Sequence, residues 1–140
     1  MKKILWIGLM VSLFASLVSC ATFSKKAITI GDLSILKGRW EGERQIRDAT
    51  GKFAAVMEIY NDTVPLKGKL TLYEVLLAGI RGSTEEINFQ DGKIDAAGRF
   101  VLTLPNMTLE LTLYQSSDKT KLEGDYLYKV VKGTMVLYKK

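Results

Sequence analysis

From residue 36 onward, apolar and polar side chains alternate with a period of two, which constrains the fold of this 140-residue chain more than any other feature. In residues 107–114, four apolar side chains (Met107, Leu109, Leu111, Leu113) alternate with Thr108, Glu110, Thr112 and Tyr114. Successive side chains of an extended chain point to opposite faces, so each such segment offers one face to a core and one to water. The pattern predicts an antiparallel, all-β protein.

Segments of this kind recur at short spacing, with turn residues such as Asp91-Gly92 and Lys132-Gly133 near their ends. We expect about eight strands, at 36–47, 53–60, 67–77, 83–90, 93–104, 107–114, 121–130 and 134–139, with residues 93–104 forming either one bent strand or two. A small antiparallel up-and-down barrel suits them best, because closure removes the exposed edges of a sheet. An open sandwich is the alternative.

The alternation also predicts which side chains lie inside the barrel and which outside. We expect these to point inward: Trp40, Phe100, Leu102, Leu109, Leu111 and Tyr126. The outward positions carry charges: Lys37, Arg39, Glu41, Glu43 and Lys129. A barrel that spans a membrane needs an apolar outer band, so this pattern argues against one.

The first twenty residues differ from the rest of the chain. Met1-Lys2-Lys3 is a short cationic start, and residues 4–18 contain no charge over 15 positions. A membrane-spanning helix needs about 20 apolar residues, so this run is typical of a signal peptide. We expect residues 1–19 to be removed on export.

The end of this run, Leu17-Val18-Ser19-Cys20, resembles the lipobox of bacterial lipoproteins. The resemblance implies that cleavage follows Ser19 and that the Cys20 thiol carries a diacylglycerol, with the new amine commonly acylated too. Two or more acyl chains anchor a protein stably, whereas one does so only marginally. We therefore expect a cell-envelope protein held to membrane lipid through Cys20. Ala21 is not aspartate, which in Gram-negative bacteria favours the outer membrane, facing the periplasm.

These features divide the chain into three parts. Residues 1–19 are the signal peptide, and residues 36–140 are the barrel domain. The stretch between them shows no clear period, so we expect residues 20–35 to be the lipidated N-terminus and a tether.

A second resemblance concerns the first strand of the barrel. Leu36-Lys37-Gly38-Arg39-Trp40-Glu41-Gly42 resembles the Gly-x-Trp opening strand of the lipocalins and the wider calycin group. Gly124-Asp125-Tyr126-Leu127-Tyr128 is similar to that family's later Asp-Tyr motif, with a different tyrosine spacing. The arginine that the family has on its last strand is missing, since no arginine follows Lys121. The resemblance implies an eight-stranded barrel that holds a small hydrophobic ligand.

The composition argues against catalysis and nucleic-acid binding. Histidine is absent and the single cysteine is assigned to the lipid, which removes the usual general base, metal ligand and thiol nucleophile. Glu85 and Glu86 are adjacent on a strand and so face opposite ways. The part after Cys20 carries 18 basic and 15 acidic residues, scattered rather than clustered. We expect no enzyme, cofactor, metal or nucleic-acid partner.

Four residues are candidates for ligand contact. Arg44 shares the inward register of Trp40, and Tyr126 and Tyr128 share the inward register of their strand. An apolar pocket with a few polar groups is typical of small-ligand sites. The first hypothesis is a barrel that binds a hydrophobic or amphipathic molecule. The second is an interaction protein with a filled core that docks onto another envelope protein, in which Trp40 simply plugs the core.

Overall fold

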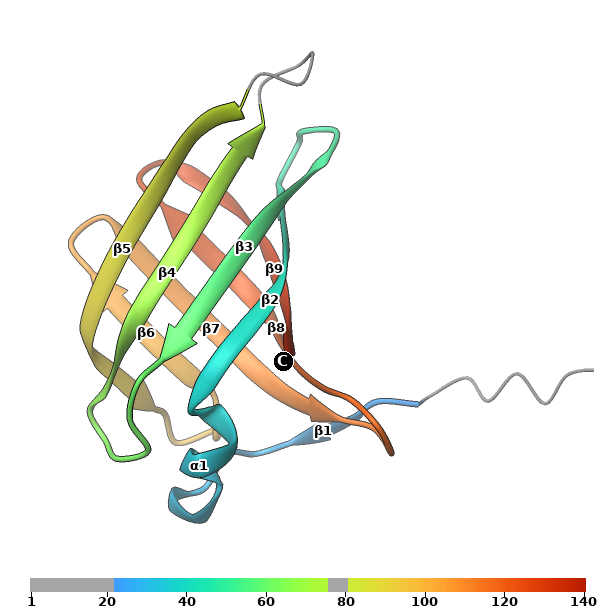
Figure 1. The fold of residues 1–140 in the computed structure, drawn as a ribbon, viewed down its shortest axis with the longest axis vertical. Helices are drawn as coiled ribbons and strands as arrows, with labels where there is room; N and C mark the ends of the chain where they lie inside the picture. Colours follow the sequence, from blue (N-terminus) through green and yellow to red (C-terminus); the bar gives the residue numbers. More distant parts are fainter. Residues whose placement is uncertain (1–21, 76–80) are drawn as a thin grey trace, which may run out of the picture.

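Eight antiparallel strands close into a barrel in the computed structural model, which describes residues 22–75 and 81–140 (Figure 1). Each strand pairs with the next along the chain, and the last pairs back with the first. The strands are β2 (Gly38–Ile46), β3 (Lys52–Ile59), β4 (Leu66–Val75), β5 (Arg81–Ile94), β6 (Phe100–Leu104), β7 (Met107–Gln115), β8 (Thr120–Tyr128) and β9 (Val131–Lys139). The predicted all-β, up-and-down barrel is confirmed.

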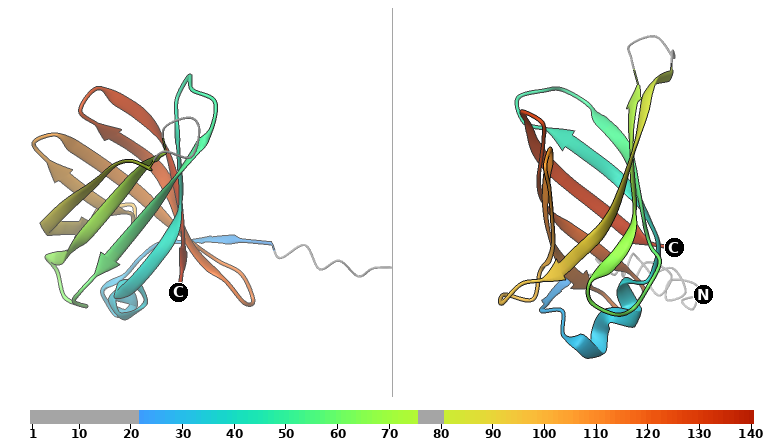
Figure 2. Two further views of the ribbon diagram at one scale, coloured as in Figure 1. Left: turned by 45° about the horizontal axis from the view of Figure 1, so that its top comes forward. Right: turned by 90° about the vertical axis from the view of Figure 1, so that its left-hand side faces the viewer.

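The two ends of the barrel differ in what covers them. At one end, which we call the helix end, lie the short helix α1 (Leu33–Leu36) and the connections at residues 60–65, 95–99 and 116–119 (Figure 2). The connections at residues 47–51, 105–106 and 129–130 lie at the other end, which we call the opposite end. Within the described residues, no helix is both long enough and apolar enough to cross a bilayer.

The segment before β2, where the sequence showed no clear period, is packed against the barrel. Strand β1 (Ser24–Lys26) pairs with the end of β7, and a 3₁₀ turn, η1 (Ile30–Asp32), leads into α1. Ile28, Leu33 and Leu36 are buried in the same core as the barrel. The folded domain therefore begins near residue 24, which leaves few residues for a tether.

The core fills the barrel interior from the helix end upward. All six residues predicted to point inward are buried, with exposed fractions of 0–3%. Trp40 lies beneath α1, and its indole Nε1 donates to the Leu36 carbonyl at 2.8 Å. A water-sized void would leave exposed area on the side chains around it. The fully buried side chains of Leu70, Leu102 and Met135 therefore border no such void.

Two predicted turns lie instead inside strands. Asp91-Gly92 belongs to β5 and Lys132-Gly133 to β9. A Cβ at Gly92 would lie 2.9 Å from the Phe100 ring, and one at Gly133 would lie 2.1 Å from the Gln45 carbonyl oxygen. These glycines allow close approach of neighbouring strands rather than chain reversal. The β8–β9 reversal instead uses Lys129, with φ +54°.

The wall of the barrel is weakest between β5 and β6. Among the described residues, only Lys93–Val101 and Ile94–Phe100 pair there, although β5 spans 14 residues. The pairing of β7 with β8, by contrast, runs from Met107–Tyr128 to Gln115–Thr120. Most of the β5 edge that faces β6 therefore has no ladder partner among the described residues.

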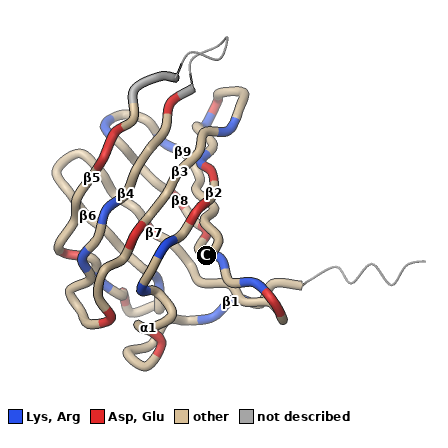
Figure 3. The backbone as a smooth tube through the Cα atoms, in the orientation of Figure 1, with Lys and Arg blue, Asp and Glu red and all other residues tan. Residues whose placement is uncertain are grey.

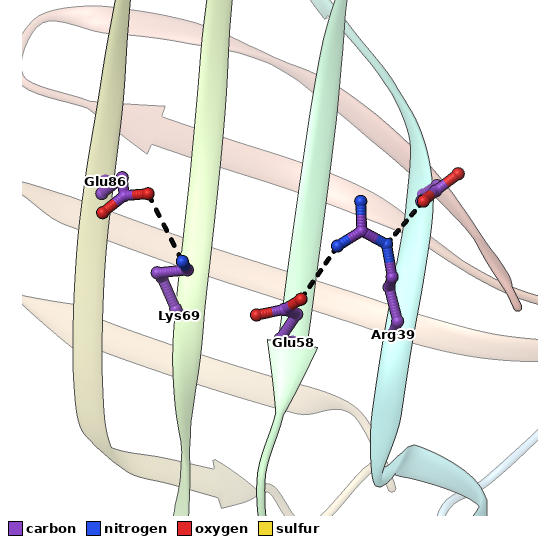
Figure 4. A network of polar contacts seen from close by, with 5 residues as sticks. Arg39, Glu58, Lys69 and Glu86 are labelled. Carbon is purple, nitrogen blue, oxygen red and sulfur yellow. Dashed lines mark hydrogen bonds and ion pairs between the residues drawn. The ribbon is translucent and has the colours of Figure 1, made fainter.

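Basic and acidic residues are interspersed along the strands (Figure 3). Arg39 on β2 donates to Glu58 on β3 at 2.9 Å, and Lys69 on β4 lies 3.3 Å from Glu86 on β5 (Figure 4). Such exposed ion pairs contribute little to the stability of the fold. Their charges are compatible with a face that is exposed to solvent.

Candidate functional site

A buried arginine lies inside the barrel near the opposite end. Arg44 is the third residue from the end of β2, and only 2% of it is exposed. Its Nη1 donates to the phenol oxygen of Tyr126 on β8 at 3.2 Å, and its Nη2 lies 3.7 Å from a carboxylate oxygen of Glu74 on β4. The fold thus brings together Arg44 and Tyr126, two of the residues considered as candidates for ligand contact.

Two aromatic rings flank the Arg44 guanidinium. Its central carbon lies 5.2 Å from the ring centroid of Phe53, its cross-strand partner on β3, and 5.8 Å from that of Tyr126. The Tyr126 ring has room because residue 133, opposite it on β9, is glycine. A Cβ there would lie 2.8 Å from the ring and its hydroxyl. Cation–π contact and the charge of Glu74 offset part of the cost of burying this cation.

Two polar atoms of this cluster are buried without a hydrogen-bond partner among the described groups: Arg44 Nε and the Tyr128 hydroxyl. Tyr128 follows Tyr126 by two residues on the same face of β8, so both rings belong to the barrel interior. Burial raises the pKa of Tyr128, the Glu85 carboxylate near its hydroxyl raises it further, and the nearby Lys129 ammonium lowers it, although neither group completes a hydrogen bond to the hydroxyl. The hydroxyl therefore stays protonated and can both donate and accept.

Two carboxylates of this end were not among the predicted site residues. Glu74 shares the strand face of buried Leu70 and Leu72, and Glu85 is the cross-strand partner of Leu72. Glu85 also lies 3.9 Å from Lys129, which follows β8. The available sequence signal was a charged residue on the apolar register near a strand end. Among the described residues, no three acidic, histidine or cysteine side chains cluster as a metal site would require.

Trp40 lies apart from this cluster. It is four residues before Arg44 on β2, about 13 Å along an extended strand, and the ammonium of Lys139 lies 4.9 Å from its ring. The structure thus places Trp40 at the helix end, whereas Arg44 and Tyr126 are in contact near the opposite end, where β8 ends with Tyr128. Cys20, the predicted lipidation site, lies outside the described residues.

The cluster can bind, by its chemistry, an oxygen-bearing group. Arg44 Nε is a charged donor, and the Tyr128 hydroxyl is a donor and acceptor. Apolar side chains surround them: Met107 is the cross-strand partner of Tyr128, and Leu104 pairs with Met107. The combination of a few polar atoms and an apolar surround is what small-molecule sites use.

No protein-family model matches the sequence, and neither a curated protein nor a solved structure shows detectable similarity to it.

Proposed function

We propose that this chain is a lipid-anchored protein of the cell envelope, and that its barrel binds one small amphipathic molecule near the opposite end. The observation that carries the proposal is the burial of two polar atoms, Arg44 Nε and the Tyr128 hydroxyl, that have no hydrogen-bond partner in the described part of the chain. The polar group of the ligand accepts a hydrogen bond from them, and its apolar part lies against Phe53, Leu104 and Met107.

The free-energy cost of burying these two polar atoms favours a ligand near the opposite end of the barrel. A buried polar atom without a partner costs about 1–3 kcal/mol, and more when it is charged. Two such atoms inside one small barrel are an expensive feature. A ligand oxygen that accepts from Arg44 and Tyr128 recovers that cost on binding.

The filled interior limits how far the ligand reaches. Leu70, Leu102 and Met135 are fully buried below the cluster, so a long chain along the barrel axis would have to displace the core. We expect affinity to rise with the first few carbons of a ligand tail and then to level off.

The anchor rests on the lipobox resemblance at Leu17–Cys20. Cys20→Ser removes the thiol that accepts the diacylglycerol. The exported variant should lose acyl labelling and leave the membrane fraction. A correctly exported Cys20→Ser protein that still sediments with membranes would refute the anchor.

Titration of residues 21–140 with medium-chain fatty acids and the matching alcohols, followed by calorimetry, tests the binding site. Tyr128→Phe should weaken both ligand types, and Arg44→Leu should weaken the acids more, because it removes a charge-assisted hydrogen bond. Tyr114→Phe, on the outer face of β7, is the matched control. Calorimetry is preferable to tryptophan fluorescence, since Trp40 lies at the far end of the barrel.

A second candidate function, docking onto another envelope protein, is favoured by the filled interior itself. It predicts that no ligand of the series binds saturably and that Tyr128→Phe leaves every titration unchanged. That outcome would replace the ligand-binding proposal.

A further inference from the structure

We propose that the helix end of the barrel is a membrane-contact surface, which lies against the lipid head groups of the bilayer that holds the Cys20 anchor. The inference rests on the anchor of the proposed function and does not depend on the ligand site. It assigns an occupant, a phospholipid surface, to one end of the barrel.

Exposed apolar side chains gather at this end. Among the described residues, five large hydrophobic side chains are exposed, and four of them belong to the helix end: Ile30 (87%), Tyr60 (55%), Val64 (50%) and Tyr138 (38%). Ile30 is in η1, Tyr60 and Val64 are in the β3–β4 connection, and Tyr138 is near the end of β9. Single exposed apolar residues are ordinary, but their concentration at one end is typical of a contact surface.

The chain also enters the domain at this end. Ser24 pairs with Gln115, the last residue of β7, beside the 116–119 turn. In the sequence, Cys20 precedes Ser24 by only four residues. An acylated Cys20 therefore holds the helix end close to the bilayer.

A groove of about 520 Å³ beside this entry point has the chemistry of a membrane interface. Phe23 and Tyr138 line it, with ring centroids 6.4 Å apart. Lysines 119, 139 and 140 also line it, together with the acids Glu41 and Asp118. Aromatic rings at head-group level with lysines that reach toward phosphates are characteristic of protein surfaces on lipid.

With the helix end on the membrane, the opposite end of the barrel, where Arg44 and Tyr128 lie, faces the aqueous compartment. Molecules in that compartment then reach the ligand cluster without crossing lipid.

Single-cysteine reporters in the acylated mature protein, which begins at Cys20, test the orientation. The native thiol is consumed by the lipid, so an added cysteine is unique. Ile30→Cys and Val130→Cys form a matched pair, because Ile30 and Val130 are 87% and 92% exposed and lie at different ends. Each variant is labelled with a bimane fluorophore and reconstituted into phosphatidylcholine–phosphatidylglycerol vesicles. Mass spectrometry checks acylation, and circular dichroism checks the fold.

We expect the label at residue 30 to be quenched by spin-labelled lipid and protected several-fold from aqueous iodide, and the label at residue 130 to behave in the opposite way. Equal iodide quenching at both sites of the acylated protein would overturn the orientation and leave the anchor intact. An unacylated Cys20 would overturn the anchor and this orientation with it. Ligand titrations decide the ligand site separately.

Discussion

Arg44 and Tyr126 are 82 residues apart in the sequence, and the Arg44 Nη1 donates to the Tyr126 hydroxyl at 3.2 Å inside the barrel. The two residues lie on β2 and β8, which are separated by β9. Gly133 on β9 lies opposite Tyr126 and has no side chain. The Tyr126 ring can therefore extend across β9 and contact the Arg44 guanidinium. Closure of the barrel by the β2–β9 pairing is therefore what creates the polar cluster.

The two tyrosines of β8 should respond differently to loss of the hydroxyl. Tyr126→Phe removes the acceptor of a charged donor and should lower the free energy of unfolding by about 1.5–3 kcal/mol. Tyr128→Phe removes a hydroxyl that is buried without a partner, so the unliganded domain should be equally stable or slightly more stable. Urea denaturation of both variants measures the difference. A clear destabilisation by Tyr128→Phe would mean that its hydroxyl has a partner in solution.

Trp40 seals the barrel beneath α1. Trp40→Ala should lower the free energy of unfolding by about 3–5 kcal/mol, the usual cost of deleting a large buried aromatic side chain. Part of that cost is the loss of the 2.8 Å hydrogen bond to the Leu36 carbonyl. Trp40→Phe retains most of the volume and should cost less than the alanine variant. A cost below about 1 kcal/mol for Trp40→Ala would contradict its place in the core.

Asp32 gives the helix end a specific dependence on pH. The Lys26 ammonium at 2.8 Å and the Thr29 hydroxyl and amide lower the pKa of Asp32 from 3.8 to about 2. Because the folded-state pKa is the lower one, the carboxylate stabilises the fold fully above about pH 4. This contribution is lost as the pH falls toward 2.

Asp32→Asn removes this dependence, so its stability should fall less steeply than that of the wild type between pH 4 and 2. Asp48→Asn, at an exposed turn with φ +64°, is the charge-matched control and should follow the wild type. Chemical denaturation at half-unit pH steps measures all three proteins. Parallel curves for Asp32→Asn and the wild type would refute the ion-pair assignment.

The sequence predicted the strands well because a barrel strand repeats every two residues, and eight segments carry that repeat. It did not predict β1, η1 and α1, because they span only three, three and four residues, which is too short for a hydrophobic period to show. Gly92 and Gly133 were interpreted as turn residues because close approach between strands leaves no signal in a single sequence.

The candidate site was predictable in part for the same reason. The alternation of side chains along a strand places Arg44, Tyr126 and Tyr128 inside the barrel, and the structure brings the first two into contact. The same alternation applies to Glu74 and Glu85, but each is near a strand end, where a charged side chain usually faces water. Only the order of strands around the barrel reveals that Glu74 lies 3.7 Å from Arg44.

The short β5–β6 ladder predicts an alternating pattern of amide exchange. In an antiparallel strand, successive residues direct their amides alternately to one neighbour and the other. From Thr84 to Phe89, β5 pairs regularly with β4, but its pairing with β6 is confined to Lys93 and Ile94. Amides of this segment that face β4 should be protected, and those between them should exchange faster.

Residues 107–111 of β7 are the internal control, because β6 and β8 pair with them on both sides. Their amides should be protected without alternation. Amide exchange followed by nuclear magnetic resonance resolves the individual residues of both strands. Uniform protection from Thr84 to Phe89 would show that β6 or another segment covers this edge in solution. Alternation would identify the β5–β6 side as the part of the barrel wall that separates at least cost, because few backbone hydrogen bonds close it.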